Sequence, residues 1–241
     1  MRILGVDTST STASTAIVDS GEIVAEDFYP RQRKAGRGPK ANHSEIILPL
    51  VDAVLKRAGI GLLDVAGIAV SVGPGSFTGI RIGVSTVKGL VYGTDIPACG
   101  ISTLQAIAAR VTGFDGIVCS LLDARKNEAY AAVFHKHGNH LERLTEDEIV
   151  PILRVFEQLR AFGEPCLFIG DGVTAYRALI EQLPELQVHI AEEDAMVSVA
   201  ASVARLSESQ FFDNRAALLG DLVPIYLRRP ECESRMRVAR K

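Results

Sequence analysis

The sequence lacks the features that mark membrane, secreted and disulfide-stapled proteins. Its longest apolar runs fall far short of the roughly 18 residues that a bilayer-spanning helix requires. The first residues reach an acid at Asp7 without an apolar segment and cleavage site, so no secretory signal is expected. The 4 cysteines are scattered and form no C-x-x-C pair, which argues against a disulfide framework or a zinc knuckle. We therefore expect a cytoplasmic protein that makes no contact with a membrane.

The charge of the chain is nearly balanced but unevenly placed. The formal net charge is −3 over 241 residues, and the hydrophobic share of 47% is ordinary for a folded protein of one or two domains. Residues 31–40 nevertheless carry five basic side chains and no acid, and residues 228–241 carry six basic side chains against two acids. Such segments can contact a polyanion such as RNA, or they can simply be solvated, and both interpretations stay open.

Apolar periodicity predicts the same order of elements in both halves of the chain. In the first half it predicts strands at 2–7, 14–19 and 22–29, a helix at 44–58, a strand at 67–72, a helix at 78–92, a strand at 97–101 and a helix at 102–111. In the second half it predicts strands at 117–123, 128–135 and 140–145, a helix at 146–162, a strand at 166–170, a helix at 173–183, a strand at 187–191 and a helix at 196–209.

This repeat predicts an α/β protein made of two related βββαβαβα domains. We place the first domain at 1–113, the second at 114–227 and a basic tail at 228–241. An alternative for the helix at 196–209 is that it packs back on the first domain. In each half the first strand ends in an acid, Asp7 or Asp123. A duplicated, RNase H-like unit of this kind resembles the fold of actin, Hsp70 and the sugar kinases, which predicts a site in the cleft between the halves.

The residues that would cradle a phosphate in that fold are unusual here. Glycine is needed where the backbone approaches an anion closely, but the positions two residues after Asp7 and Asp123 hold Ser9 and Arg125. We therefore expect no tightly bound cofactor, and only weak or interface-dependent ATP or ADP binding with these four residues as candidates. The alternative is that both acids are turn residues that accept hydrogen bonds from nearby amides.

The most unusual segment is GPGSFTGIR at residues 73–81. It is not a P-loop, because no Gly-Lys-[Ser/Thr] follows, and its glycine spacing is one residue too long for the dinucleotide fingerprint. It resembles the signature of the bacterial TsaB (YeaZ) family. Further matching segments are ILGVDTST at 3–10, HSE at 43–45, STL at 102–104, DAR at 123–125, EAY at 128–130 and PIYLR at 224–228. The resemblance extends to about residue 229, and only the basic stretch at 31–40 departs from the family pattern.

The resemblance implies a non-catalytic subunit that binds and activates a TsaD-like catalytic subunit. With a TsaE-like ATPase, that complex transfers threonylcarbamoyl from threonylcarbamoyl-AMP to N6 of the adenosine just 3′ of the anticodon, forming t6A. The substrates are tRNAs that read codons beginning with A, and this chain would meet tRNA through the complex. The resemblance also implies a homodimer when the catalytic subunit is absent.

Two enzymatic alternatives remain, both disfavoured by particular residues. A small-molecule kinase of the same fold should bind ATP tightly, which Ser9 and Arg125 oppose. A metallopeptidase of the M22 type should carry the two metal ligands of the H-x-x-x-H helix found in TsaD-like relatives, one helical turn apart. Here the two ligand positions of that helix hold His43 and Ile47. We therefore expect neither a catalytic residue nor a metal site.

Two helices are the expected partner surface. The helix at 44–58 is apolar over a wider arc than contact with one sheet requires, and the helix at 78–92 carries glycines one turn apart. Such small-residue patches allow another helix to approach closely, although packing between these two helices is an equally good explanation. The predicted interface residues are Ile46, Leu48, Leu50, Leu55, Gly79, Ile82, Gly83, Thr86, Gly89 and Gly93.

Overall fold

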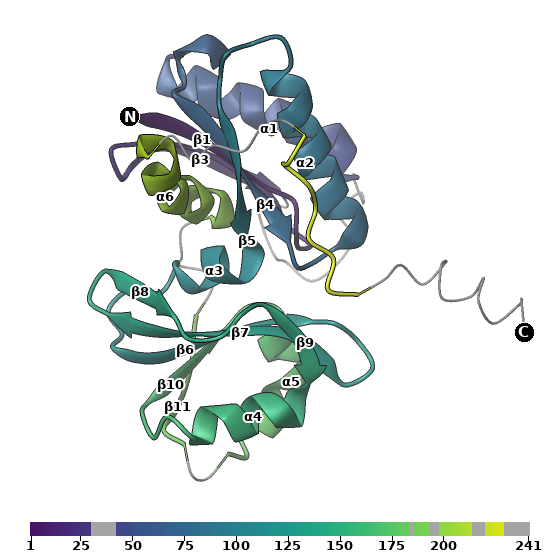
Figure 1. Cartoon of the computed structure of the whole chain (residues 1–241), viewed down its shortest axis with the longest axis vertical. Helices are drawn as coiled ribbons and strands as arrows, with labels where there is room; N and C mark the ends of the chain where they lie inside the picture. Colours follow the sequence, from purple (N-terminus) through teal and green to yellow (C-terminus); the bar gives the residue numbers. More distant parts are fainter. Residues whose placement is uncertain (30–41, 184–185, 193–197, 214–219, 229–241) are drawn as a thin grey trace, which may run out of the picture.

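The computed structural model describes residues 1–29, 42–183, 186–192, 198–213 and 220–228. The basic stretch at 31–40 and all but the first residue of the basic tail at 228–241 lie outside the described residues. The described chain forms two sheets, one above the other in Figure 1. Among the described helices, none has the length and apolar character needed to cross a membrane.

The two sheets have the same topology. In the first sheet the order is β3-β2-β1-β4-β5, with strands Arg2–Asp7 (β1), Ala13–Asp19 (β2), Glu22–Tyr29 (β3), Gly67–Gly73 (β4) and Ala98–Ser102 (β5). In the second sheet the order is β11-β10-β6-β7-β8, with strands Gly116–Asp123 (β6), Glu128–His137 (β7), His140–Arg143 (β8), Cys166–Ile169 (β10) and Val188–Ile190 (β11). In each sheet the first strand pairs antiparallel with the second and parallel with the fourth. The predicted duplicated α/β fold is therefore confirmed.

Two helices cover the outer face of each sheet. Helices α1 (His43–Ala58) and α2 (Phe77–Val91) form a core with β1 and β4. Helices α4 (Ile152–Arg160) and α5 (Gly172–Ile180) do the same with β6 and β10. A 3-10 turn at Leu62–Asp64 (η1) precedes β4.

The last helix of each half packs on the sheet of the other half. Helix α3 (Thr103–Ala108) is preceded by Ser102, the predicted cap, whose hydroxyl accepts a hydrogen bond from Gln105 N. Its Leu104 and Ile107 lie against the second sheet. Helix α6 (Val199–Phe212) packs on β1, β2 and β4 of the first sheet. Because α3 and α6 also contact each other, they form one layer between the sheets (Figure 1).

The helix predicted at 146–162 is wrong in its first third. Residues Glu148–Pro151 form a short strand, β9, that pairs antiparallel with β7, and α4 begins only at Ile152. The β-branched Ile149 and Val150 suit an extended backbone. Pro151 has no N–H to donate, so it fits the end of an edge strand and the start of a helix better than a helix interior.

Candidate functional site

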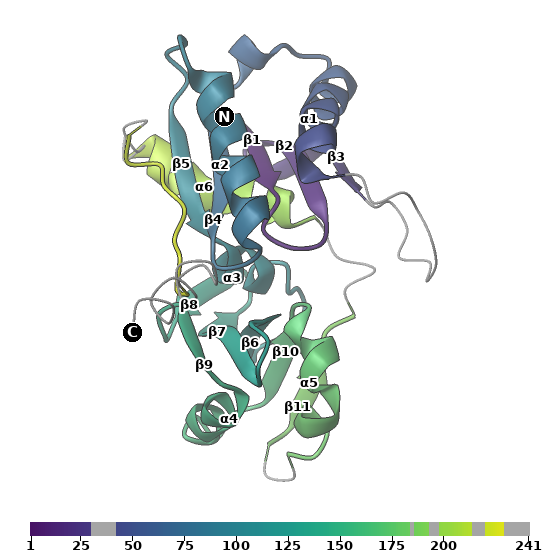
Figure 2. The same cartoon turned by 90° about the vertical axis from the view of Figure 1, so that its right-hand side faces the viewer.

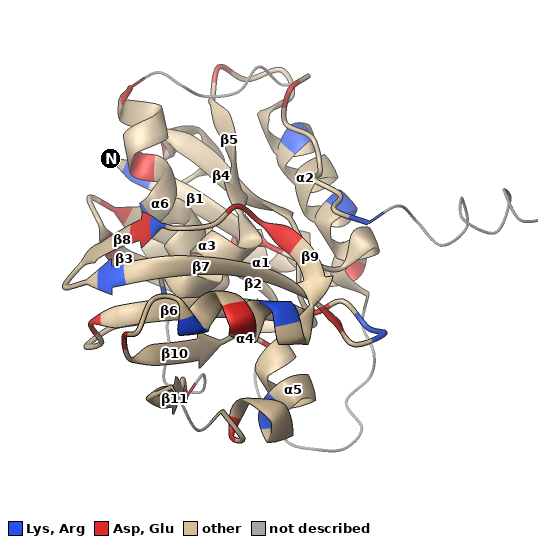
Figure 3. Cartoon of the chain, turned by 60° about the horizontal axis from the view of Figure 1, so that its bottom comes forward, with Lys and Arg blue, Asp and Glu red and all other residues tan. Residues whose placement is uncertain are grey.

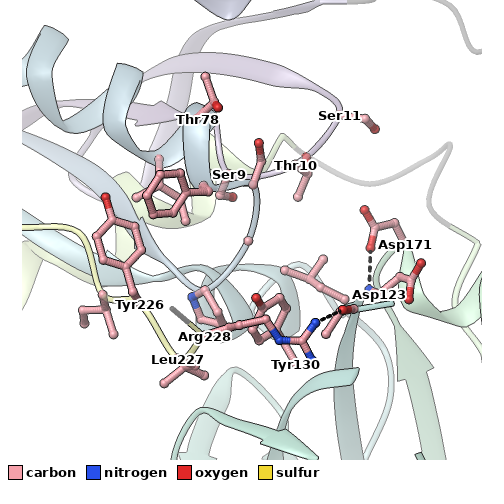
Figure 4. A pocket seen from close by; sticks show the side chains of 18 of the residues that line it. Ser9, Thr10, Ser11, Thr78, Asp123, Tyr130, Asp171, Tyr226, Leu227 and Arg228 are labelled. Atoms are coloured by element: carbon pink, nitrogen blue, oxygen red, sulfur yellow. Dashed lines mark hydrogen bonds between the residues drawn. The ribbon is translucent and has the colours of Figure 1, made fainter. Parts of the chain in front are cut away.

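A cleft of about 700 Å³ lies between the two halves. The turn between β1 and β2 and the N-terminus of α2 line it from the first half, and the turn between β6 and β7 lines it from the second. The C-terminal segment at 225–228 passes along it. Figure 4 shows Ser9 and Thr10 at the top, Asp123 and Asp171 at the right, and Arg228 below them.

The structure brings three of the four predicted nucleotide-binding residues into this cleft. Ser9, Asp123 and Arg125 line it, and Asp7 does not. Asp7 is buried beneath Ser9, whose hydroxyl and backbone N–H donate to Asp7 Oδ1 at 2.5 and 3.2 Å. Asp7 therefore holds the turn in place from below.

Several amides of both turns donate to acceptors of the chain itself. In the second half, Arg125 N donates to Asp123 Oδ1 at 2.8 Å and Asp123 N donates to Asp171 Oδ1 at 3.3 Å. Ala124 N donates to Glu128 O, and Glu128 N donates to Arg125 O. In the first half, Ser9 N is taken by Asp7, as described above. A phosphate would have to displace these bonds before the amides could bind it.

The β6–β7 turn has a strained backbone. Arg125, Lys126 and Asn127 have φ values of 63°, 57° and 61°, in the left-handed region that favours glycine. For residues with a side chain this conformation costs about 1 kcal/mol or more each. The chain thus keeps the turn of a phosphate-binding hairpin without the glycines that make such a turn inexpensive.

Burial dominates the electrostatics of Asp7. Burial raises the pKa of Asp7 above its usual range, and the Ser71 and Ser9 hydroxyls, backbone hydrogen bonding at Ser9 and the charge of His43 oppose this shift only in part. Its second oxygen, Oδ2, is buried, and no described residue donates to it in good hydrogen-bond geometry. The folded state therefore holds a proton on Asp7 more strongly than the unfolded state does.

Asp7→Asn is expected to raise the free energy of unfolding above that of wild type at pH 8, but not at pH 4. The pKa of Asp7 is higher in the folded than in the unfolded state, so the bound proton stabilises the fold fully below the unfolded pKa of about 3.9. That stabilisation is lost as the pH rises through the folded-state pKa. Asparagine keeps the shape without the charge, so the gain should be near zero at pH 4 and about 1 kcal/mol or more at pH 8. Urea unfolding of both proteins across this range measures it. A variant that is less stable than wild type at pH 8 would contradict the account.

The segment 73–81 is a packing motif. Gly73 has φ +121°, and a side chain there would meet Ile225 O at 2.5 Å. Gly75 has φ +153°, and a side chain there would meet Ser9 O at 2.3 Å. Ser76 caps α2 by accepting from Gly79 N, while its own N–H donates to Ser9 O at 2.7 Å. The motif thus joins α2 to the β1–β2 turn and to the C-terminal segment.

The predicted partner residues divide into outward-facing and inward-facing sets. Helices α1 and α2 contact each other over the first sheet (Figure 2). Leu48, Gly89 and Gly93 are exposed, and Ile46, Leu55, Ile82 and Thr86 are half-buried. Leu50, Gly79 and Gly83 are buried, the two glycines against Thr8. Leu48 has 52% of its surface exposed, and Tyr92, which follows the end of α2 and was not among the predicted residues, has 80% exposed.

The outer face of α4, on the second half, also exposes a large apolar side chain. Figure 3 marks basic and acidic residues along α4, and Arg154 pairs there with Glu157 at 3.7 Å. The exposed Leu153 stands among these charges. Charged residues are exposed on α1 as well, where Lys56 pairs with Asp52 at 2.7 Å, so the two helical surfaces differ in the half of the molecule to which they belong and not in charge.

Sequence reasoning missed the C-terminal segment as part of the site. Tyr226 and Arg228 line the cleft, and Arg81 Nε donates to Tyr226 OH at 2.7 Å across a separation of 145 residues. The matching segment PIYLR at 224–228 was the available signal, but it gives no local indication of where the chain returns.

The site contains no arrangement of metal ligands within the described residues. His43 lines the cleft at the start of α1, and Ile47 one turn later is buried in the first core.

Comparisons with known proteins agree with this geometry. The model of the TsaD family, tRNA N6-adenosine threonylcarbamoyltransferase, matches residues 31–231. The tRNA threonylcarbamoyladenosine biosynthesis protein TsaB of Bacillus subtilis is 31% identical, over 98% of this chain and 97% of its own length. TsaB of Escherichia coli is 29% identical, over 95% of each chain. The solved structure of YeaZ from Pseudomonas aeruginosa, 25% identical, superposes with a TM-score of 0.76 over 94% of this chain and 99% of its own.

Proposed function

This chain belongs to the TsaB family and acts in the biosynthesis of threonylcarbamoyladenosine in tRNA, and from that premise we propose that it binds and activates a TsaD-like transferase without catalysing the reaction itself. The transferase then moves threonylcarbamoyl from threonylcarbamoyl-AMP to N6 of the adenosine 3′ of the anticodon. A TsaE-like ATPase completes the complex, and tRNA is met through that complex in the cytoplasm. In the absence of the transferase the chain forms a homodimer.

The large apolar side chains exposed on α1 and at the end of α2 carry this proposal. Leu48 and Tyr92 are large apolar side chains with 52% and 80% of their surface exposed, and the half-buried Ile46 and Ile82 lie on the same two helices. An exposed apolar surface of this kind on paired helices is typical of a protein–protein contact. A TsaD-like transferase is the occupant we propose, because the TsaD family model matches most of this chain, so the two proteins share a fold and can present similar helices.

The cleft supports a non-catalytic role. A kinase of this fold would present free amides to a nucleotide's phosphates, whereas the amides at Ser9 and Arg125 are bonded to Asp7 and Asp123. We therefore propose that this chain binds no nucleotide tightly alone, and that any ATP or ADP contact is weak or depends on the interface with the partner.

Leaving this chain out of a reconstituted reaction tests the proposal. The mixture contains the TsaD-like transferase, the TsaE-like ATPase, the adenylate-forming enzyme, tRNA, ATP, threonine and bicarbonate. Modified adenosine is quantified by mass spectrometry after nuclease digestion. We expect product to fall at least about tenfold when the chain is omitted, and the chain without the transferase to form none.

Two outcomes would reject parts of this proposal. Equal product with and without the chain would remove the activating role. Product from the chain without the transferase would make it an enzyme. In either case, calorimetry of the isolated chain with Mg-ATP would then test the kinase alternative, which requires tight binding.

A further inference from the structure

The C-terminal residues 222–228, named here the strap, are anchored on the first half of the molecule. Leu222 is buried in the first core, and Ile225 N donates to Val72 O at 2.7 Å, just before the turn into α2. Gly73 leaves room for the Ile225 carbonyl, as described above. The strap therefore joins the end of β4 by one backbone hydrogen bond.

An aromatic contact fixes the middle of the strap on α2. The Tyr226 ring lies 4.7 Å from the Phe77 ring, measured between centroids. The Arg81 guanidinium carbon lies 3.9 Å from the Phe77 centroid, and Arg81 Nε donates to the Tyr226 hydroxyl at 2.7 Å. Stacking, cation–π attraction and a hydrogen bond thus act on one side chain.

Two residues later the strap reaches the second half. Arg228 Nη1 donates to Ala124 O at 2.6 Å, and Nη2 pairs with the Glu128 carboxylate. Ala124 and Glu128 stand immediately before and after the strained residues 125–127. Arg228 therefore holds both ends of the β6–β7 turn, and Figure 4 shows its side chain extending to the Asp123 side of the cleft.

We propose that Arg228 is a positioning residue that bridges the cleft in the way a bound ligand bridges the lobes of a two-lobed protein. The guanidinium fork binds a carbonyl and a carboxylate on the second half, while Tyr226 ties the strap to the first half. In the β6–β7 turn, the amides of Ala124, Arg125 and Glu128 already donate to acceptors of the chain itself. The side chain of Arg228 likewise connects the two halves without a ligand. The halves are then held in one orientation without a nucleotide.

Hydrogen exchange of the full chain tests this proposal independently of the transferase. Ala124 N and Glu128 N are hydrogen-bonded within the turn, and they report on its opening. Arg228→Ala should speed their exchange about tenfold, with β1 amides unchanged as evidence of an intact fold. The exchange rates in Arg228→Lys should lie between those of wild type and Arg228→Ala, because lysine keeps the charge but cannot bind both acceptors as a fork. The matched control is Arg177→Ala, which removes an arginine paired with Glu181 on α5.

A double-mutant cycle with Glu128→Gln separates a bridge from a general loss of stability. If the two residues act as one bridge, Arg228→Ala combined with Glu128→Gln should exchange no faster than Arg228→Ala alone. Unchanged turn exchange in Arg228→Ala, or additive effects in the double variant, would overturn the proposal.

Activity adds a second readout that rests on the proposed function. In the reconstituted reaction Arg228→Ala should lower product formation and Arg228→Lys should restore part of it. If exchange rises as expected while omission of the whole chain leaves product unchanged, the bridge stands and the proposed function fails.

Discussion

Leu48→Arg is expected to weaken binding of the TsaD-like transferase by at least about 100-fold and to reduce modified adenosine to the level seen without this chain. Leu48 is 52% exposed on α1, so the fold should tolerate arginine there. In a complex, however, the guanidinium would be buried in an apolar contact without a partner, which costs several kcal/mol. Calorimetry gives the affinity and the reconstituted reaction gives the product.

The matched control is Leu153→Arg on α4. Leu153 is 61% exposed and, like Leu48, lies on a helix that carries exposed charged residues, but it belongs to the second half. This variant should bind and activate like wild type. If both variants lose binding equally, or neither does, the α1–α2 surface is not the docking site.

Gly79→Ala is expected to destabilise the protein by about 3 kcal/mol or more. A Cβ at Gly79 would lie 2.0 Å from Thr8 O, and this neighbour is backbone that cannot rotate away. The contact is fixed further because Thr8 Oγ1 donates to Gly79 O at 2.7 Å. Relieving the overlap requires α2 to move off the β1–β2 turn, and such overpacking is costly. Chemical denaturation measures the free energy of unfolding.

Gly89→Ala, ten residues along the same helix, is the control. No atom lies within 4 Å of a Cβ built at Gly89, so only the helix propensity changes. Alanine should stabilise the protein by about 0.5–1 kcal/mol. Opposite signs for the two substitutions are the expected result, and a loss of similar size in both would contradict the assignment of Gly79 to internal packing.

Much of the fold could be predicted because its signals are local. The apolar strands Arg2–Asp7 and Glu22–Tyr29 were predicted with the bounds that the structure shows, since alternation and turn residues define them in the sequence. The strand β9 was missed because four residues ending in Pro151 give too short a pattern to separate from a helix start. Its pairing with β7 depends on contacts made only in the folded chain.

The candidate site was predictable only in its local parts. The resemblance of the repeated unit to the actin, Hsp70 and sugar-kinase fold predicted that Ser9 and Arg125, which follow the acids ending the first strand of each half, would face a cleft, and both line it. The sequence did not show that Gly79 turns inward, since a glycine pattern is the same for internal and external helix contacts. Arg228 could not be placed because its partners, Ala124 and Glu128, lie about a hundred residues away.

The exchange of α3 and α6 between the halves affects the order in which the chain can mature on the ribosome. β1 is synthesised first, yet α6, which shields the inner face of β1, follows the entire second sheet. Ile3, Ala69 and Cys99 on that face thus wait for Val203 and Ala204 to arrive. We expect a nascent chain with such an exposed sheet to be prone to aggregation until α6 has been synthesised. A gene split between the two halves would yield fragments that each lack a layer of their core.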